Sequence, residues 1–156
     1  MSNWVWAAGA CLAAIILETI CAGREPAAAL KALRQPPWAL PFPAWVAIGF
    51  VYYLACFVAW VRLLGLAMAE VCLALLILLM GANAIWTYFF FRRRDFRLSF
   101  WVQIPYAALA IGFLGCAMFL DAVVASLFAV YVLYLPYAAA WTYRVWKLNG
   151  DVMREV

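Results

Sequence analysis

The chain contains no histidine, and acidic and basic side chains together make up only 12% of its 156 residues. The absence of histidine excludes a histidine general base, a Ser-His triad and most zinc sites. The seven carboxylates are scattered along the chain, which has neither a glycine-rich phosphate loop nor a cluster of metal-ligand residues. We therefore expect no conventional enzyme and no obligatory cofactor.

Cysteine is present, but no spacing pairs one cysteine with another. None of the five belongs to a C-x-x-C motif, and all lie in apolar segments: Cys11, Cys21, Cys56, Cys72 and Cys116. A free buried cysteine behaves as a small apolar residue. We therefore expect these side chains to pack in the protein interior and not to form a disulfide framework.

Apolar residues dominate the chain, at 72% of the total with a mean hydropathy of +1.01. Soluble domains are about 45–50% apolar. A membrane-spanning helix needs about 20 mostly apolar residues, and five segments qualify, at roughly 4–23, 44–64, 67–91, 98–120 and 122–146. No barrel-like alternation is visible. The sequence predicts an all-α integral membrane protein, a single five-transmembrane-helix bundle covering residues 1–156.

The basic residues are distributed unevenly between the two ends of this bundle. The end that holds the N-terminus has Arg62, and the opposite end has ten of the 11 lysines and arginines. The positive-inside rule then places the N-terminus outside and the C-terminus in the cytoplasm. We expect the run Arg92–Arg94 to contact anionic membrane lipid and not nucleic acid.

One connection, residues 24–43, is longer than the others. Its first half predicts a short interfacial helix with Leu30 and Leu33 on one side. Its second half, residues 36–43, has four prolines and is not expected to form a regular helix. With Trp38 in its middle, the segment is either a fixed lid over the mouth of the bundle or a plain interfacial linker, and composition does not decide between them.

Asn83 and Trp86 lie three residues apart in the third span, on one face of the expected helix. An asparagine at that depth is costly without a polar partner. It either bonds a neighbouring helix, where such a hydrogen bond contributes roughly 0.6 kcal/mol, or forms the wall of a pocket for a planar ligand together with the indole. Spacing alone leaves both interpretations open.

Two further features lie within the expected spans. Glu18 lies near the end of the first span, where its carboxylate either reaches the membrane interface or takes part in a proton relay. A relay needs a second ionisable group, and Glu70 is expected near the opposite membrane face. Pro136 should kink the fifth span, which either opens a cavity or shapes the packing.

Three motifs resemble the TspO family, the tryptophan-rich sensory or translocator proteins. The first is Pro36-Pro37-Trp38 with Tyr53 fifteen residues after the tryptophan. The second is Asn83-Ala-Ile-Trp86, followed by Phe89-Phe90. The third is the ending Val145-Trp146-Lys147-Leu148-Asn149. The resemblance runs from about residue 34 to 149 and is that of a divergent bacterial member.

The resemblance implies a five-helix bundle, usually a homodimer, whose pocket accepts porphyrins, haem or other planar hydrophobic molecules. It implies a receptor or sensor that regulates a tetrapyrrole or stress response. A small-molecule transporter or efflux partner and a light-dependent porphyrin-degrading activity are the alternatives. The ligand-binding positions it implies are Trp38, Tyr53, Asn83, Trp86, Phe90, Tyr134 and Ala138.

Two family aromatics are missing from the alignment. The tryptophan of the second span falls on Gly49, and without a gap that of the fifth span falls on Tyr134. A gapped alignment would use Pro136-Tyr137 and Trp141 instead, but the ungapped one matches the ending. We therefore expect the wall facing Asn83 and Trp86 to lack two aromatics, and any porphyrin-degrading activity to be weak or absent.

Overall fold

The computed structural model describes residues 2–150, and within them the chain forms helices and no strand. Five helices are long and apolar enough to cross a membrane, which confirms the predicted all-α, five-span bundle. They are α1 (Asn3–Ala22), α3 (Phe42–Leu63), α4 (Glu70–Thr87), which continues as the π-helix η1 (Tyr88–Arg92), α5 (Phe96–Leu120) and α6 (Ala122–Asn149). The short helix α2 (Pro26–Lys31) lies in the connection between the first two spans.

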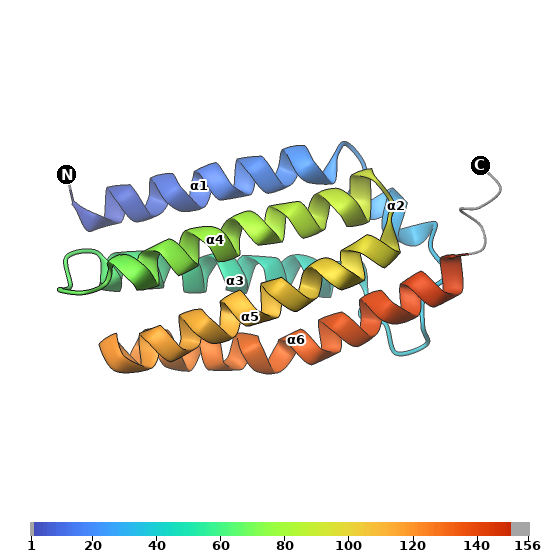
Figure 1. Cartoon of the computed structure of the whole chain (residues 1–156). Coiled ribbons are helices and arrows are strands. Elements are labelled where there is room, and N and C mark those ends of the chain that lie inside the picture. The colour runs from blue at the N-terminus through green and yellow to red at the C-terminus, as the bar shows by residue number, and fades with distance from the viewer. Residues whose placement is uncertain (1, 151–156) are drawn as a thin grey trace.

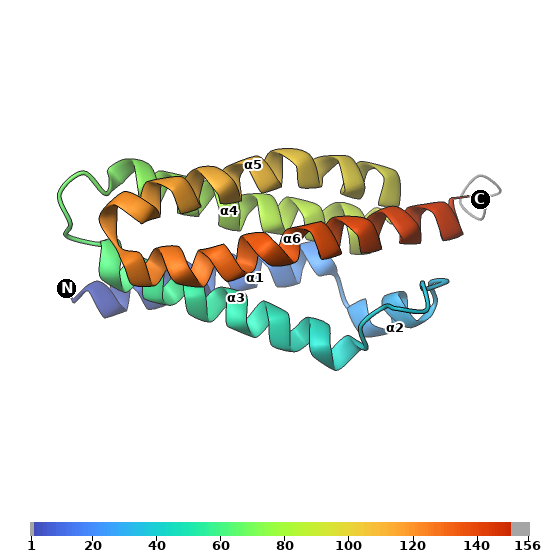
Figure 2. The same cartoon turned by 90° about the horizontal axis from the view of Figure 1, so that it is seen from below.

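The five long helices pack side by side as a closed ring. α1 contacts both α3 and α4, α4 contacts α5, α5 packs most extensively against α6, and a weaker contact between α6 and α3 closes the ring. Figure 1 shows that α1 begins and α6 ends at opposite ends of the bundle, and that α2 lies at the end where α6 finishes. Figure 2, from below, shows α3 diverging from the other helices toward α2.

The outer surface of the ring is a coat of apolar side chains. Phe50, Phe119 and Leu133 are 70%, 91% and 79% exposed. In water such a continuous apolar surface would drive association, whereas in a bilayer the acyl chains cover it. Backbone groups meanwhile bond within each helix, as hydrocarbon requires. The chain is a multi-pass membrane protein.

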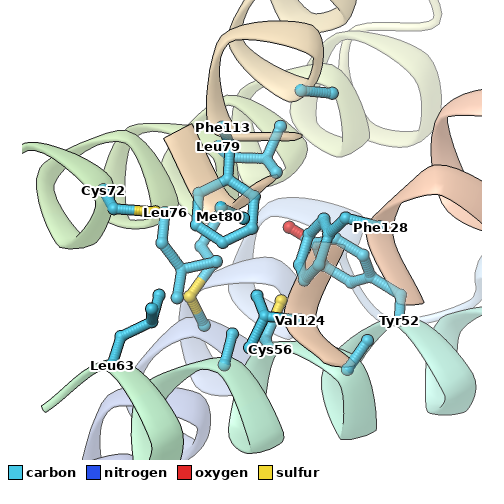
Figure 3. Close-up of a cluster of buried hydrophobic side chains, with 14 of the residues drawn as sticks. Tyr52, Cys56, Leu63, Cys72, Leu76, Leu79, Met80, Phe113, Val124 and Phe128 are labelled. Atoms are coloured by element: carbon cyan, nitrogen blue, oxygen red, sulfur yellow. The ribbon is translucent and has the colours of Figure 1, made fainter. Parts of the chain in front are cut away.

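The interior holds two hydrophobic clusters, one toward each end of the bundle. Figure 3 shows the larger one, in which Leu76 of α4 and Cys56 of α3 lie in the same cluster as Phe113 and Phe128. These two phenyl rings are 4.4 Å apart. The smaller cluster joins Leu30 of α2 to aromatic side chains of η1, α5 and α6. All five cysteines are free, as predicted.

Several helix ends differ from the predicted spans for local reasons. α3 begins at Phe42, so the expectation that residues 36–43 are wholly non-helical is wrong at its end. Pro43 lies in the first turn, where a missing N–H breaks no hydrogen bond. α4 begins at Glu70, later than residue 67, because Gly65 and Met68 adopt positive φ values of 92° and 64° in the preceding turn.

The connection between α1 and α3 is tied to α6 along much of its length. Asn149 bonds both backbone groups of Arg34 at 3.0 Å, and the Trp141 indole donates to Gln35 Oε1 at 3.0 Å. The Tyr137 hydroxyl accepts from the Leu40 amide and donates to the Trp38 carbonyl. These bonds fix the position of the loop relative to α6.

The turn between α5 and α6 consists of one residue, Asp121, which caps α6. Its Oδ1 accepts from the amides of Val123 and Val124 at 2.9 and 3.0 Å, and Arg62 Nε of α3 donates to the carboxylate at 2.8 Å. Desolvation alone would raise the pKa of Asp121, but the amide bonds and the guanidinium outweigh it and lower the pKa below its ordinary value.

We therefore expect the stability of the bundle to fall in acid through Asp121. Because its folded pKa is lowered, its contribution is complete above about pH 4 and is lost as the pH falls through the folded value. Asp121→Ala should cost about 1 kcal/mol near neutrality and flatten this part of the pH profile. Asp121→Asn keeps a capping oxygen but removes the charge, so its difference in stability from the wild type measures the contribution of the ion pair with Arg62. Thermal unfolding in detergent across the acid range measures both, and an unchanged profile in Asp121→Ala contradicts the assignment.

Candidate ligand-binding cavity

Between the helices of the ring lies a partly open cavity of about 370 Å³, within the range of small-molecule sites, roughly 300–1,000 Å³. Side chains from all five long helices line it, and its surface is mainly apolar. Eight aromatic residues are among those that line it: Trp45, Tyr52, Tyr53, Trp86, Tyr106, Tyr131, Tyr134 and Trp141. Such a space suits a flat hydrophobic molecule.

A carboxylate hydrogen bonded to two other helices forms the polar side of the cavity. Glu18 Oε2 accepts from the Tyr53 hydroxyl at 2.5 Å and from Asn83 Nδ2 at 3.0 Å, and Oε1 accepts from the Thr87 hydroxyl at 3.2 Å. Asn83 therefore fulfils both interpretations of its spacing, because it bonds another helix and also lines the cavity. Glu18 is turned into the bundle, and not toward the membrane interface.

Three polar atoms of the cavity residues have no hydrogen-bond partner within residues 2–150. They are the indole N–H of Trp86, the amide oxygen of Gln103 and the hydroxyl of Tyr52, and all three are buried. Gln103 is oriented by its amide nitrogen, which donates to Thr142 Oγ1 at 3.0 Å. A buried polar group without a partner costs about 1–3 kcal/mol. A ligand that bonds these atoms recovers that energy.

The fixed loop positions two tryptophans at the end of the cavity nearest α2. Trp45 donates its indole N–H to the Leu40 carbonyl at 3.2 Å, and Trp141 donates to Gln35. The two indole rings lie 4.5 Å apart. The expectation that the wall lacks two aromatics is therefore wrong, since Trp45 stands one turn before Gly49 and Trp141 two turns beyond Tyr134.

The structure brings five of the seven predicted binding residues to the cavity: Tyr53, Asn83, Trp86, Tyr134 and Ala138. Phe90 lies behind the wall, 1% exposed, with its ring 5.0 Å from that of Trp86 and 5.1 Å from that of Trp141. Trp38 lies on the outer side of the loop, 43% exposed, and packs edge-on against Tyr137. Neither Phe90 nor Trp38 lines the cavity.

Reasoning from the sequence did not identify several residues of the wall. Trp45, Tyr106 and Trp141 line the cavity, but nothing in the sequence shows which way they face, because the residues around them in each span are also apolar. Gln103, which also lines the cavity, is a polar residue within a span and so does carry a signal that it faces the interior. The gapped alignment of span five does point to Trp141. For Glu18 the signal was its charge within a span, which by itself marks a candidate functional residue.

A second hollow, an apolar groove of about 920 Å³, runs along α3 and α6 outside the cavity. Its walls include Val51 and Val130, which are 61% and 70% exposed on the outer surface of the bundle. Four side chains border both spaces, namely Ile48, Tyr52, Tyr131 and Tyr134. The cavity and the groove are therefore neighbouring spaces that share part of their lining.

Residues 7–147 match the TspO/MBR family. No curated protein matches the chain.

The position of Phe90 predicts a structural effect of its removal. Phe90→Ala should lower the free energy of unfolding by about 3 kcal/mol, because it leaves a cavity among Trp86, Phe96 and Trp141. Phe119→Ala is the matched control, since Phe119 is 91% exposed and should change stability by about 0.5 kcal/mol or less. Unfolding by SDS in mixed micelles measures both, and equal losses would show that Phe90 is not a packed residue.

Proposed function

The chain belongs to the TspO/MBR family, and we propose that it is a membrane receptor that binds planar hydrophobic ligands, porphyrins and haem among them, inside its bundle. The family suggests a sensor- or transporter-like role in the membrane. The observation that carries the proposal is the aromatic cavity with unpartnered polar atoms on its wall. Ligand occupancy would then regulate a tetrapyrrole or stress response.

The chemistry of the wall supports a planar ligand with polar edges. Indole and phenol faces offer stacking surfaces, the Trp86 N–H can donate to the ligand, and the Gln103 oxygen can accept from it. The exposed cations Lys31, Arg34 and Arg92 lie on α2, the loop and η1. This basic rim attracts the carboxylates of a porphyrin.

The same proposal includes the orientation of the protein in the membrane and its oligomeric state. The basic rim faces the cytoplasm and the start of α1 faces outward, because ten of 11 basic residues lie at that end of the sequence-based topology. The membrane is a bacterial inner membrane, as the resemblance to bacterial members of the family implies. Two copies form a homodimer. Gly112 and Gly115 of α5 have open space where a Cβ would lie, so a second copy can approach closely there.

A titration with protoporphyrin IX in detergent tests the receptor. We expect saturable quenching of tryptophan fluorescence, with affinity reduced about tenfold in Asn83→Ala and Trp86→Ala, since each removes a polar contact or a stacking face. Trp101→Ala is the control, because Trp101 is 50% exposed on α5 and outside the cavity. Absence of saturable quenching contradicts the proposal. Loss of the Soret band on illumination would identify porphyrin degradation instead.

The carboxylate in the cavity favours transport as a second candidate function. Glu18 is an ionisable group within a span and next to a ligand-sized space, a combination found along transport pathways. A transporter should move porphyrin across proteoliposomes at a rate that falls severalfold in Glu18→Gln, whereas Glu70→Gln should leave the rate unchanged. Tight binding without flux would favour the receptor.

A further inference from the structure

Within residues 2–150, Glu18 is the one acidic side chain that lines the cavity, and no basic side chain is paired with it. Within residues 2–150 the one ion pair is that of Arg62 with Asp121, in the turn between α5 and α6. Arg92 of η1 reaches α1, but its guanidinium donates to the Ile20 carbonyl at 3.1 Å and not to Glu18. The groups that contact the carboxylate are neutral.

The hydrogen bonds of Glu18 leave room for one more donor. A carboxylate offers about four acceptor positions, and Tyr53, Asn83 and Thr87 fill three of them, two on Oε2 and one on Oε1. Glu18 is half-buried and lines the cavity. A donor on a ligand can therefore complete its coordination from the cavity side.

The surroundings select among the cations that could neutralise this charge. Within the described part of the chain no three His, Cys, Asp or Glu side chains come together to hold a metal ion. The cavity that Glu18 lines is instead mainly apolar, and Tyr53, Trp86 and Trp45 are among the aromatic side chains of its wall. Aromatic faces attract organic cations, and an apolar wall favours one with a hydrophobic body.

We propose that Glu18 recognises a cationic nitrogen, so that the cavity prefers hydrophobic ligands that carry a protonated amine or an amidine. The nitrogen donates to the carboxylate, and the hydrophobic body packs against the tryptophans of the wall. The inference rests on the proposed function, because it assumes that the cavity binds ligands. It also orients a porphyrin, whose carboxylates stay at the basic rim and away from Glu18.

The test compares two ligands that differ in charge alone. (Naphthylmethyl)dimethylamine is protonated at neutral pH, and isobutylnaphthalene is its uncharged isostere. Isothermal titration calorimetry measures the binding of each to the full chain in nanodiscs, with empty nanodiscs as the blank. We expect the amine to bind about tenfold more tightly than the hydrocarbon, the gain of a charge-assisted hydrogen bond.

Two variants assign the preference to a residue. Glu18→Gln keeps the shape and an acceptor oxygen but removes the charge, so the ratio of the two affinities should fall to about one. Glu70→Gln removes an exposed carboxylate at the start of α4 and should keep the wild-type ratio. The ratio of affinities cancels any difference in partitioning into lipid between the proteins.

Each result separates the inference from the function on which it rests. Equal affinity of both ligands for the wild-type protein overturns cation recognition, and saturable porphyrin quenching then leaves the receptor proposal standing. A preference that persists in Glu18→Gln also overturns it. If that variant does not fold, the wild-type ratio alone decides. Absence of saturable binding for both ligands and for porphyrin contradicts the receptor itself.

Discussion

The absence of water in the bilayer core is the constraint on which the rest of this structure depends. Each polar side chain in a span must find a partner within the bundle or bear the cost of having none. Glu18 meets this demand by accepting bonds from Tyr53, Asn83 and Thr87, which joins three helices at one point. The same demand turns the carboxylate inward, so that the polar part of the cavity follows from the way in which α1 packs against α3 and α4.

The loop between the first two spans holds the aromatic end of the cavity in place through hydrogen bonds. Gln35 and Leu40 accept bonds from the indoles of Trp141 and Trp45, and Asn149 holds the backbone of Arg34. The loop does not itself line the cavity. Its effect is to fix the orientation of two rings that do, and Phe90 supports one of them from behind.

The sequence predicts the number and location of the long helices, but it does not predict all of the residues that line the cavity. Hydropathy located the five spans, and their number determined the topology, because length and composition are local properties. The inward positions could not be predicted from the pattern, since residues facing lipid are as apolar as those facing the interior. The spacing of Asn83 and Trp86 identified one face of α4. The sequence does not indicate Trp45, because the family tryptophan of this span aligns with Gly49, one turn away, where the structure has no ring. The resemblance to the family places Trp38 and Phe90 in the pocket. A sequence motif does not show whether a side chain faces the cavity or packs behind its wall.

The one-residue turn at Asp121 has a consequence for how the chain reaches its folded state. The entropy lost in closing a loop grows with loop length, so the two long helices that flank this turn meet at little entropic cost. They also share the most extensive contact in the bundle. α5 and α6 therefore form a helical hairpin that is held together by its own turn and its own contacts, and the other three spans pack against it.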